Sequence, residues 1–366
     1  MGLRETAWPS WKWIVAIAWV SLFALGLIDN SRGVVFPDLL REFSLSDTEG
    51  SFFFLVCSLA TLVHNIWLYR FLSTTAPLRL IGIYTAIMGA GAVSIALAPT
   101  YMWTLASAVV LGFGFGGLGV GQNAAVQAAP KQIRQRALGL LHSMYGISSF
   151  LAPLLITYLA HVVSWRSAAL LLSLPAMLIC GVAWWVIANG CSQESPSQDL
   201  QNNRDMRLAQ RPTAAFFLAA TLVSLLVVAE ISISSRLALL ARREFGLSAV
   251  HAGHLVAAYF AAMTLSRLAL GFFVGIRGWK PSAKTLLYIS FGLGLPFLAI
   301  GFLPFAVFQD IRLMALAAFG FPIAMGYPLA MTRFAEVFGE KAQAVTSLCL
   351  VFQSGASVAM HFVLGW

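Results

Sequence analysis

Long apolar runs, separated by short polar segments, dominate the hydrophobic pattern of this chain. Each run is long enough for a membrane-spanning helix, which needs about 20 residues. In hydrocarbon every backbone N–H and C=O needs a partner within the protein, so continuous apolar runs predict helices. We count eleven runs, and they occupy 11–36, 48–70, 78–98, 101–128, 136–162, 166–189, 213–240, 248–275, 283–304, 309–333 and 341–366.

The composition supports this interpretation of the pattern. Apolar residues make up 59% of the chain and charged residues 10%. A typical soluble domain has about 45–50% apolar and about 25% charged residues. The sequence therefore predicts an all-α polytopic protein in the lipid bilayer of a cell membrane, and we expect a bacterial inner membrane.

Charge placement predicts the orientation of the chain. Lys and Arg gather in alternate connections, such as KQIRQR at 131–136 and NRDMRLAQR at 203–211. Connections rich in Lys and Arg stay in the cytoplasm, so we expect a cytoplasmic N-terminus. The net charge of +9 then reflects topology. Because no basic–aromatic patch accompanies it, we expect no nucleic-acid partner.

A charged hexapeptide occurs twice in the chain. REFSLS at 41–46 and REFGLS at 243–248 each fall between the first and second predicted helix of a half. Matching position and helix order indicate an internal duplication of two parallel halves. Ser46 and Ser248 are expected to cap the helices that follow them.

The chain has one long polar connection, which runs from 190 to 212 and is rich in Ser, Gln, Asn and Arg. It lacks apolar periodicity and is typical of a linker, which the charge pattern places in the cytoplasm. We therefore expect an N-terminal six-helix bundle over 1–189, this linker, and a C-terminal five-helix bundle over 213–366.

Two helical halves joined by a cytoplasmic linker resemble the major facilitator superfamily, whose halves are related by an axis along the membrane normal. The stretch GFGFGGLGVGQNAAVQAAP, followed by RQRALGLLHSMYGISSFLAPLL and SWR, is similar to helices 4 and 5 of fucose permease-like sugar transporters. In the second half, VVAEISISSRLALLARREFGLS and AAMTLSRLALGFF are similar to that group's helix 7 glutamate and helix 8 arginine. The resemblance implies two parallel helical bundles with twelve helices in total. We count eleven here, so the twelfth helix is absent from the predicted set.

Two acidic residues fall inside predicted spans, where an ionisable group is costly unless it pairs or faces water. Asp29 lies in the first span with Arg32 three residues later, and Glu230 lies in the seventh span with Arg236 nearby. We predict that both acids carry coupling protons and that the two arginines are their charge partners. The alternative is that each acid only forms a structural ion pair.

Neutral polar side chains within spans are candidates for substrate binding, because amides, phenols and imidazoles can hydrogen-bond sugar hydroxyls. Hydrogen bonds between helices would explain the same residues. The candidates are Gln122, Asn123, His142, Tyr145, Tyr327 and Gln353.

Arg267, Arg333 and Glu336 lie near the predicted cytoplasmic ends of spans, where they could form an inner gate or extend toward water. The sequence has no pattern typical of a nucleotide site, a zinc cluster or a catalytic triad. We therefore expect neither an enzyme nor a bound cofactor or metal.

These observations predict a monomeric secondary transporter that moves a small polar, sugar-like solute by alternating access and uses a proton gradient. Two alternatives stay open. Many Phe and Trp residues would also suit a proton-coupled exporter of amphipathic drugs. The missing twelfth helix would also suit a membrane receptor or sensor that transports nothing.

Overall fold

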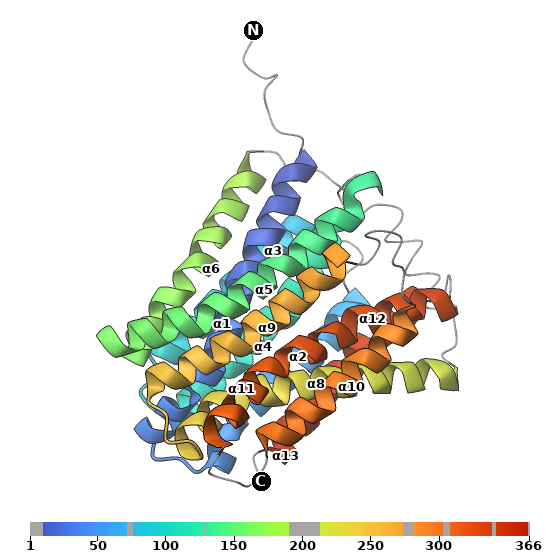
Figure 1. The fold of residues 1–366 in the computed structure, drawn as a ribbon. Helices are drawn as coiled ribbons and strands as arrows, with labels where there is room; N and C mark the ends of the chain where they lie inside the picture. Colours follow the sequence, from blue (N-terminus) through green and yellow to red (C-terminus); the bar gives the residue numbers. More distant parts are fainter. Residues whose placement is uncertain are drawn as a thin grey trace. The chain divides into compact units, whose positions relative to one another are not determined.

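The computed structural model describes residues 10–71, 76–127, 129, 131–189, 213–273, 282–302, 308–338 and 342–364. Within these residues the chain forms helices and no strands (Figure 1). The helices are α1 (Ser10–Glu42), α2 (Asp47–Phe71), α3 (Pro77–Ala96), α4 (Tyr101–Gln127), α5 (Lys131–Val162), α6 (Trp165–Ala188), α8 (Ala214–Arg243), α9 (Ala249–Phe273), α10 (Ala283–Gly301), α11 (Gln309–Ala318), α12 (Gly320–Phe338) and α13 (Ala342–Val363). The predicted linker 190–212 lies outside the described residues.

The helices follow the predicted apolar runs, and this confirms the all-helical membrane fold. Ten helical segments of the described chain are long and apolar enough to cross a membrane. The predicted run 309–333 is divided into α11 and α12 at Phe319. Pro322 follows the break and has no N–H to donate to the preceding turn, so the continuous hydrogen-bond ladder of one helix cannot form there.

The first helix is longer than the pattern predicts. The apolar run ends at 36, but α1 continues through Pro37 to Glu42. A proline inside a helix removes one backbone hydrogen bond, and membrane helices tolerate this because neighbouring groups satisfy the freed carbonyl. The six additional residues, 37–42, carry α1 into the first two residues of the first hexapeptide.

The described chain divides into two compact units, which do not coincide with the two sequence halves. One unit comprises Met1–Ile28, Val56–Ser148 and Ala169–Ala209, and the other comprises Asp29–Leu55, Ser149–Ala168 and Gln210–Trp366. Helices α1, α2, α5 and α6 contribute to both units. The division into bundles at 1–189 and 213–366 stays a prediction.

In the first unit, glycines allow α3 and α4 to pack with their backbones close together. A Cβ atom on Gly114 of α4 would lie 2.6 Å from the Cα of Met88, and one on Gly91 of α3 would lie 2.7 Å from the backbone nitrogen of Leu111. Small residues permit such close packing of membrane helices. The glycine-rich stretch of α4 therefore serves helix packing.

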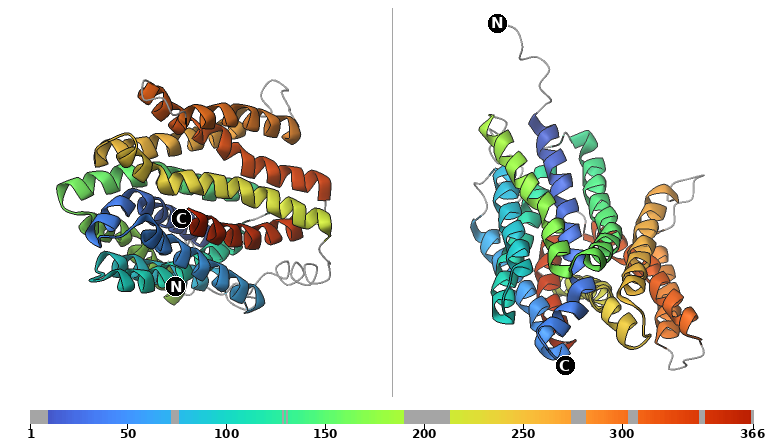
Figure 2. Two further views of the ribbon diagram at one scale, coloured as in Figure 1. Left: turned by 90° about the horizontal axis from the view of Figure 1, so that it is seen from below. Right: turned by 90° about the vertical axis from the view of Figure 1, so that its left-hand side faces the viewer.

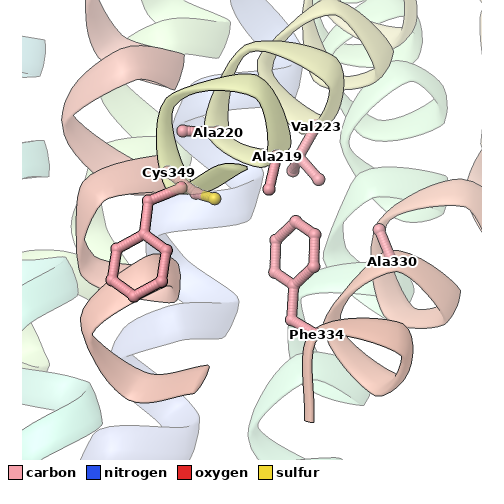
Figure 3. Packing of buried hydrophobic residues seen from close by; sticks show 7 residues of the cluster. Ala219, Ala220, Val223, Ala330, Phe334 and Cys349 are labelled. Carbon is pink, nitrogen blue, oxygen red and sulfur yellow. The ribbon is translucent and has the colours of Figure 1, made fainter. Parts of the chain in front are cut away.

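In the second unit, α8 packs against α12 and α13 through small and aromatic side chains. Figure 3 shows the ring of Phe334 beside Ala219 and Val223, with the sulfur of Cys349 near Ala220. The alanines leave room for the aromatic ring, and the cluster holds three helices that are distant in sequence together. Figure 2 shows α10 and α12, drawn in orange and red-orange, side by side in the same unit.

Both hexapeptides form the same kind of turn. Their fourth residues, Ser44 and Gly246, have left-handed backbones with φ of 52° and 64°. Their last residues then cap the next helix, as predicted, because the Oγ of Ser46 accepts the backbone N–H of Glu49 and the Oγ of Ser248 accepts that of His251, each at 3.3 Å. The repeated turn supports an internal duplication.

Candidate functional site

Glu230 of α8 forms an ion pair with Arg267 of α9. The Nη2 atom of Arg267 lies 3.3 Å from Oε1 of Glu230, and the two side chains are 30% and 17% exposed. The phenol of Tyr259, also on α9, donates to the backbone carbonyl of Glu230 at 3.3 Å. A proton on Glu230 would remove its charge and weaken the attraction between the two helices.

Asp29 of α1 pairs within its own helix. The guanidinium of Arg32, three residues further on, donates to the Asp29 carboxylate, and the side chains are 26% exposed for Asp29 and 17% for Arg32. The Nε atom of Arg32 also donates to the backbone carbonyl of Asp29 at 3.3 Å. This i,i+3 arrangement is the local ion pair that the sequence offered as the alternative to coupling.

Arg236 lies away from Glu230, although the sequence suggested it as the charge partner. Its Nη2 atom donates to Oγ of Ser51 at 2.6 Å, and its guanidinium lies over the rings of Phe36 and Phe54. Six residues along a helix amount to a rotation of about 240° after one full turn, so Arg236 points to another face of α8 than Glu230. Arg267, which the sequence placed in an inner gate, is the arginine that reaches Glu230.

Four of the predicted substrate-binding residues belong to the first unit. Gln122 is 1% exposed, and its Nε2 atom donates to Oγ of Ser21 at 3.0 Å. This bond between α4 and α1 is the interhelical alternative. Asn123 is exposed and donates to the carbonyl of its own helix at Gly119, while His142 is exposed and Tyr145 is half-buried on α5.

The remaining predicted polar residues belong to the second unit. Tyr327 is half-buried and packs against the α8, α12 and α13 cluster, and Gln353 is half-buried on α13. Arg333 of the predicted gate is exposed. The side chain of Glu336 lies outside the described residues. In the described part of the chain, no three His, Cys, Asp or Glu side chains come together as possible metal ligands.

A group of ion pairs surrounds the hexapeptide turns, and none of these pairs was among the predicted site residues. We call the three pairs Asp38–Arg242, Asp47–Arg243 and Glu42–Arg166 the turn ion pairs. Asp38 Oδ1 lies 3.0 Å from Arg242 Nη1, and Glu42 Oε1 lies 2.7 Å from Arg166 Nη2. Two of the pairs connect the ends of α1 and α2 to the end of α8.

One signal in the sequence could have revealed these pairs. Both hexapeptides begin with Arg-Glu, and acidic residues flank the first copy while basic residues flank the second. Opposite charges at corresponding turns are complementary, and a carboxylate near several arginines tends to join one of them. A comparison of the net charge of the two copies would have predicted that they meet.

Comparison with known proteins points to one family. The model of the Major Facilitator Superfamily matches residues 18–360. No curated protein matches the sequence significantly.

The fold is similar to several solved transporters. A bacterial homologue of the human lysosomal transporter Spinster, in an inward-facing and occupied conformation, has a TM-score of 0.68 at 16% identity, with 98% of this chain and 82% of that chain covered. A D-xylose–proton symporter has a TM-score of 0.70 at 12% identity, with 97% and 89% covered. A nucleoside transporter has a TM-score of 0.70 at 12% identity, with 96% and 90% covered. At these identities the likeness concerns the fold.

Proposed function

Because the chain belongs to the major facilitator superfamily, we propose that this multi-pass membrane transporter is a proton-coupled secondary transporter of a small polar solute. It would work by alternating access and as a monomer. The observation that carries the proposal is the Glu230–Arg267 pair, which joins two membrane-spanning helices at 3.3 Å. An ion pair inside a membrane is costly to break unless one charge is removed, so it suits a step that a proton controls.

The proposed cycle uses protonation of Glu230 as its switch. Ionised Glu230 attracts Arg267 and thereby keeps α8 and α9 in a fixed position relative to each other. When a proton neutralises the carboxylate, Arg267 can take another partner, such as water or solute, and the helices can move. The hydrogen bond from Tyr259 of α9 to the Glu230 carbonyl also joins the two helices and would have to break in the same step.

Asp29 is proposed as a second protonation site, with Arg32 as its charge partner. The two residues belong to one helix, so the ion pair that a proton on Asp29 would break does not itself join two helices. We therefore assign Asp29 a smaller share of the coupling than Glu230.

A polar, sugar-like solute agrees with the neutral groups along the spans. In the first unit Asn123 and His142 are exposed, and in the second unit Tyr327 and Gln353 are half-buried. Each of these amide, imidazole and phenol groups can bind hydroxyls. The buried Gln122 is engaged with Ser21 and would support the helix packing around such a site.

Vesicle transport tests the function directly. The purified full chain is reconstituted, and uptake of labelled sugars, organic acids and amphipathic drugs is measured with and without an imposed pH gradient. We expect gradient-dependent accumulation of a polar solute. Movement of amphipathic drugs alone would indicate the exporter, and binding of a solute without movement would indicate a receptor.

The proposed orientation places the N-terminus and the linker in the cytoplasm. A cysteine at Thr48, beside the first hexapeptide, should react with an impermeant thiol reagent from outside intact cells. A cysteine at Asn202, outside the described residues, should react only after the membrane is opened. The reverse pattern of labelling would overturn the orientation that the Lys and Arg distribution predicts.

A further inference from the structure

An aromatic and cationic cluster surrounds the ring of Phe54, and apart from Arg32, the partner of Asp29, neither the proposed coupling step nor the predicted sugar site uses its members. Its members come from four helices, α1, α2, α8 and α13, and all belong to the second unit. We define the Phe54 cluster as Arg32, Phe36, Ser51, Phe54, Arg236 and His361.

Two cationic groups and an imidazole contact the aromatic rings of this cluster. The Cζ atom of Arg236 lies 4.5 Å from the ring centre of Phe36 and 5.3 Å from that of Phe54. The ring of His361 stacks on Phe54 with centroids 5.2 Å apart and an angle of 18°. The guanidinium of Arg32 lies 5.7 Å from the centre of the same Phe54 ring. Such contacts favour a cation but leave its N–H groups free to bind elsewhere.

Several donors in the cluster lack an acceptor. Within the part of the chain that the structure describes, Nε and Nη1 of Arg236 and Nδ1 of His361 are buried and have no hydrogen-bond partner. His361 is only 4% exposed. Buried polar atoms are nearly always satisfied in proteins, so three orphaned atoms around one ring indicate that an acceptor binds there.

The charges around Arg236 are otherwise balanced. Asp29 is engaged with Arg32, and Asp47 is engaged with Arg243. Among the described residues, no carboxylate lies within ion-pair distance of Arg236, whose hydrogen bond goes to the neutral Ser51. A cation inside a membrane protein costs several kcal/mol unless an anion compensates it. Asp47 attracts Arg236 only from beyond ion-pair distance, so the ion-pair position beside Arg236 is left for the anion of a ligand.

We propose that the Phe54 cluster binds the carboxylate of a small monoanionic solute, and that the solute of the proposed transport function is therefore an organic acid such as an acidic sugar. The carboxylate accepts hydrogen bonds from Arg236 and from the Nδ1–H tautomer of His361. Its single charge matches Arg236, which among the described residues of the Phe54 cluster is the cation without a carboxylate at ion-pair distance, whereas a phosphate monoester would bring an excess negative charge. This proposal rests on the transport function, because it names the class of solute.

Binding is measured first, independently of transport. The full chain in lipid nanodiscs is titrated with five probes, namely a hexuronate, the matching neutral hexose, a hexose phosphate, benzoate and benzamide. We expect the acid of each pair to bind about ten- to a hundredfold more tightly than its neutral partner, as for a charged hydrogen bond inside a protein. Equal affinity of acid and neutral compound would overturn the proposal, and so would tighter binding of a hexose phosphate than of the hexuronate.

Variants then locate the site. Arg236→Gln and His361→Gln should each reduce the preference for the acid by at least about tenfold, and Arg236→Lys should restore part of it. Arg312→Gln is the matched control, because Arg312 also lies over a phenylalanine, with its Cζ 4.6 Å from the ring centre of Phe245, but lies outside the cluster. An acid preference that survives Arg236→Gln, or that disappears equally in Arg312→Gln, would contradict the assignment. If Arg236→Gln does not fold, His361→Gln decides the question.

The transport assay separates the two proposals. Gradient-driven movement of the neutral hexose, without preference for the hexuronate, would sustain the transport function and refute the anion site. Acid-selective binding that Arg236→Gln abolishes, without movement of any solute, would sustain the site and refute the transport function. Acid-selective uptake that requires Arg236 would support both.

Discussion

When the two hexapeptides are aligned, Asp29 and Glu230 lie within one residue of corresponding positions, yet they are held in different ways. Asp29 pairs with an arginine three residues away on α1, so both partners move with one helix. Glu230 pairs with Arg267 of the neighbouring helix α9, so this pair resists a change in the relation between two helices. The same kind of acid therefore has a local role in one half and a connecting role in the other.

Under the proposed coupling, this difference would let the two halves contribute unequally to one mechanism. Protonation can drive a conformational change only where the charge that it removes holds two parts of the protein together. At Glu230 the restrained movement is that of α8 against α9, whereas at Asp29 a change of charge alters hydration and the local field. The turns at 41–46 and 243–248 are similar, whereas the two acids differ in where their partners lie.

The sharpest test of this comparison is Glu230→Gln. A gradient of one pH unit supports about tenfold accumulation for each coupled proton, because about 1.4 kcal/mol corresponds to a factor of ten. We expect the variant to lose this accumulation, while exchange of solute across the vesicle membrane continues because it needs no net proton movement. Uptake and exchange are measured with labelled solute in the same vesicles. Accumulation at the unaltered level would exclude Glu230 as the coupled acid.

Asp29→Asn should have a smaller effect. The variant removes a local ion pair of the i,i+3 kind, which contributes about 0.2–0.5 kcal/mol to a helix, and leaves Glu230 and Arg267 in place. We expect accumulation to fall several-fold but not to vanish, with exchange preserved. The pH dependence of uptake should follow that of the unaltered protein. A loss as complete as that of Glu230→Gln would mean that the two acids act as one unit, contrary to the comparison.

The turn ion pairs provide a third test, on the contact between α1 and α8. Asp38 Oδ1 accepts from both Arg41 and Arg242 at 3.0 Å. Asp38→Asn weakens both contacts. A loss of about 1 kcal/mol would shift the equilibrium for separation of α8 from the end of α1 about fivefold. A cysteine at Leu239, which lines a hollow beside this pair, should then react about fivefold faster with an impermeant thiol reagent.

Asp310→Asn is the control for this test, because Asp310 is an exposed acid at the start of α11 and belongs to none of the turn ion pairs. The labelling rate at Leu239→Cys should stay unchanged in that background. Equal acceleration by both substitutions would indicate a general loosening of the protein. An unchanged rate with Asp38→Asn would show that the pair does not restrain α8.

Much of the fold was predictable because the membrane restricts the choices. Backbone groups in hydrocarbon must be satisfied within the helix, so the apolar runs correctly predicted helical segments, including α8 within three residues of its end. The caps of Ser46 and Ser248 were predictable for a similar local reason, since both precede a helix and offer a hydroxyl to its first N–H groups.

The partners of the charged residues were less predictable, because sequence distance does not tell which face of a helix a side chain occupies. Arg236 is closer to Glu230 in sequence than Arg267 is, but helical rotation takes it to Ser51 and the rings of Phe36 and Phe54. The sequence also gave no sign that His361 would stack on Phe54, since contacts between distant helices depend on how those helices pack.

The smallest predicted effect concerns the two hexapeptide turns, where the comparison between halves is closest. Ser44 and Gly246 both have left-handed backbones, with φ of 52° and 64°. A residue with a Cβ pays about 1 kcal/mol in this region, which glycine avoids. A Cβ at Gly246 would meet nothing within 4 Å, so Gly246→Ser changes the backbone energy without changing packing.

We therefore expect opposite shifts in the melting temperature of the purified protein. Gly246→Ser should lower it by about one or two degrees, and Ser44→Gly should raise it by a similar or smaller amount, because glycine relieves the strain but also gives the unfolded chain more freedom.

Gly292→Ser is the matched control. Gly292 lies inside α10, its Cβ would also meet nothing within 4 Å, and it has no positive φ, so serine there should be neutral or slightly stabilising. If Gly246→Ser and Gly292→Ser shift the melting temperature alike, the left-handed turn is not what distinguishes the two glycines. If Ser44→Gly lowers the melting temperature, the first turn depends on its serine in a way that the second does not, and the two copies are less alike than their backbones indicate.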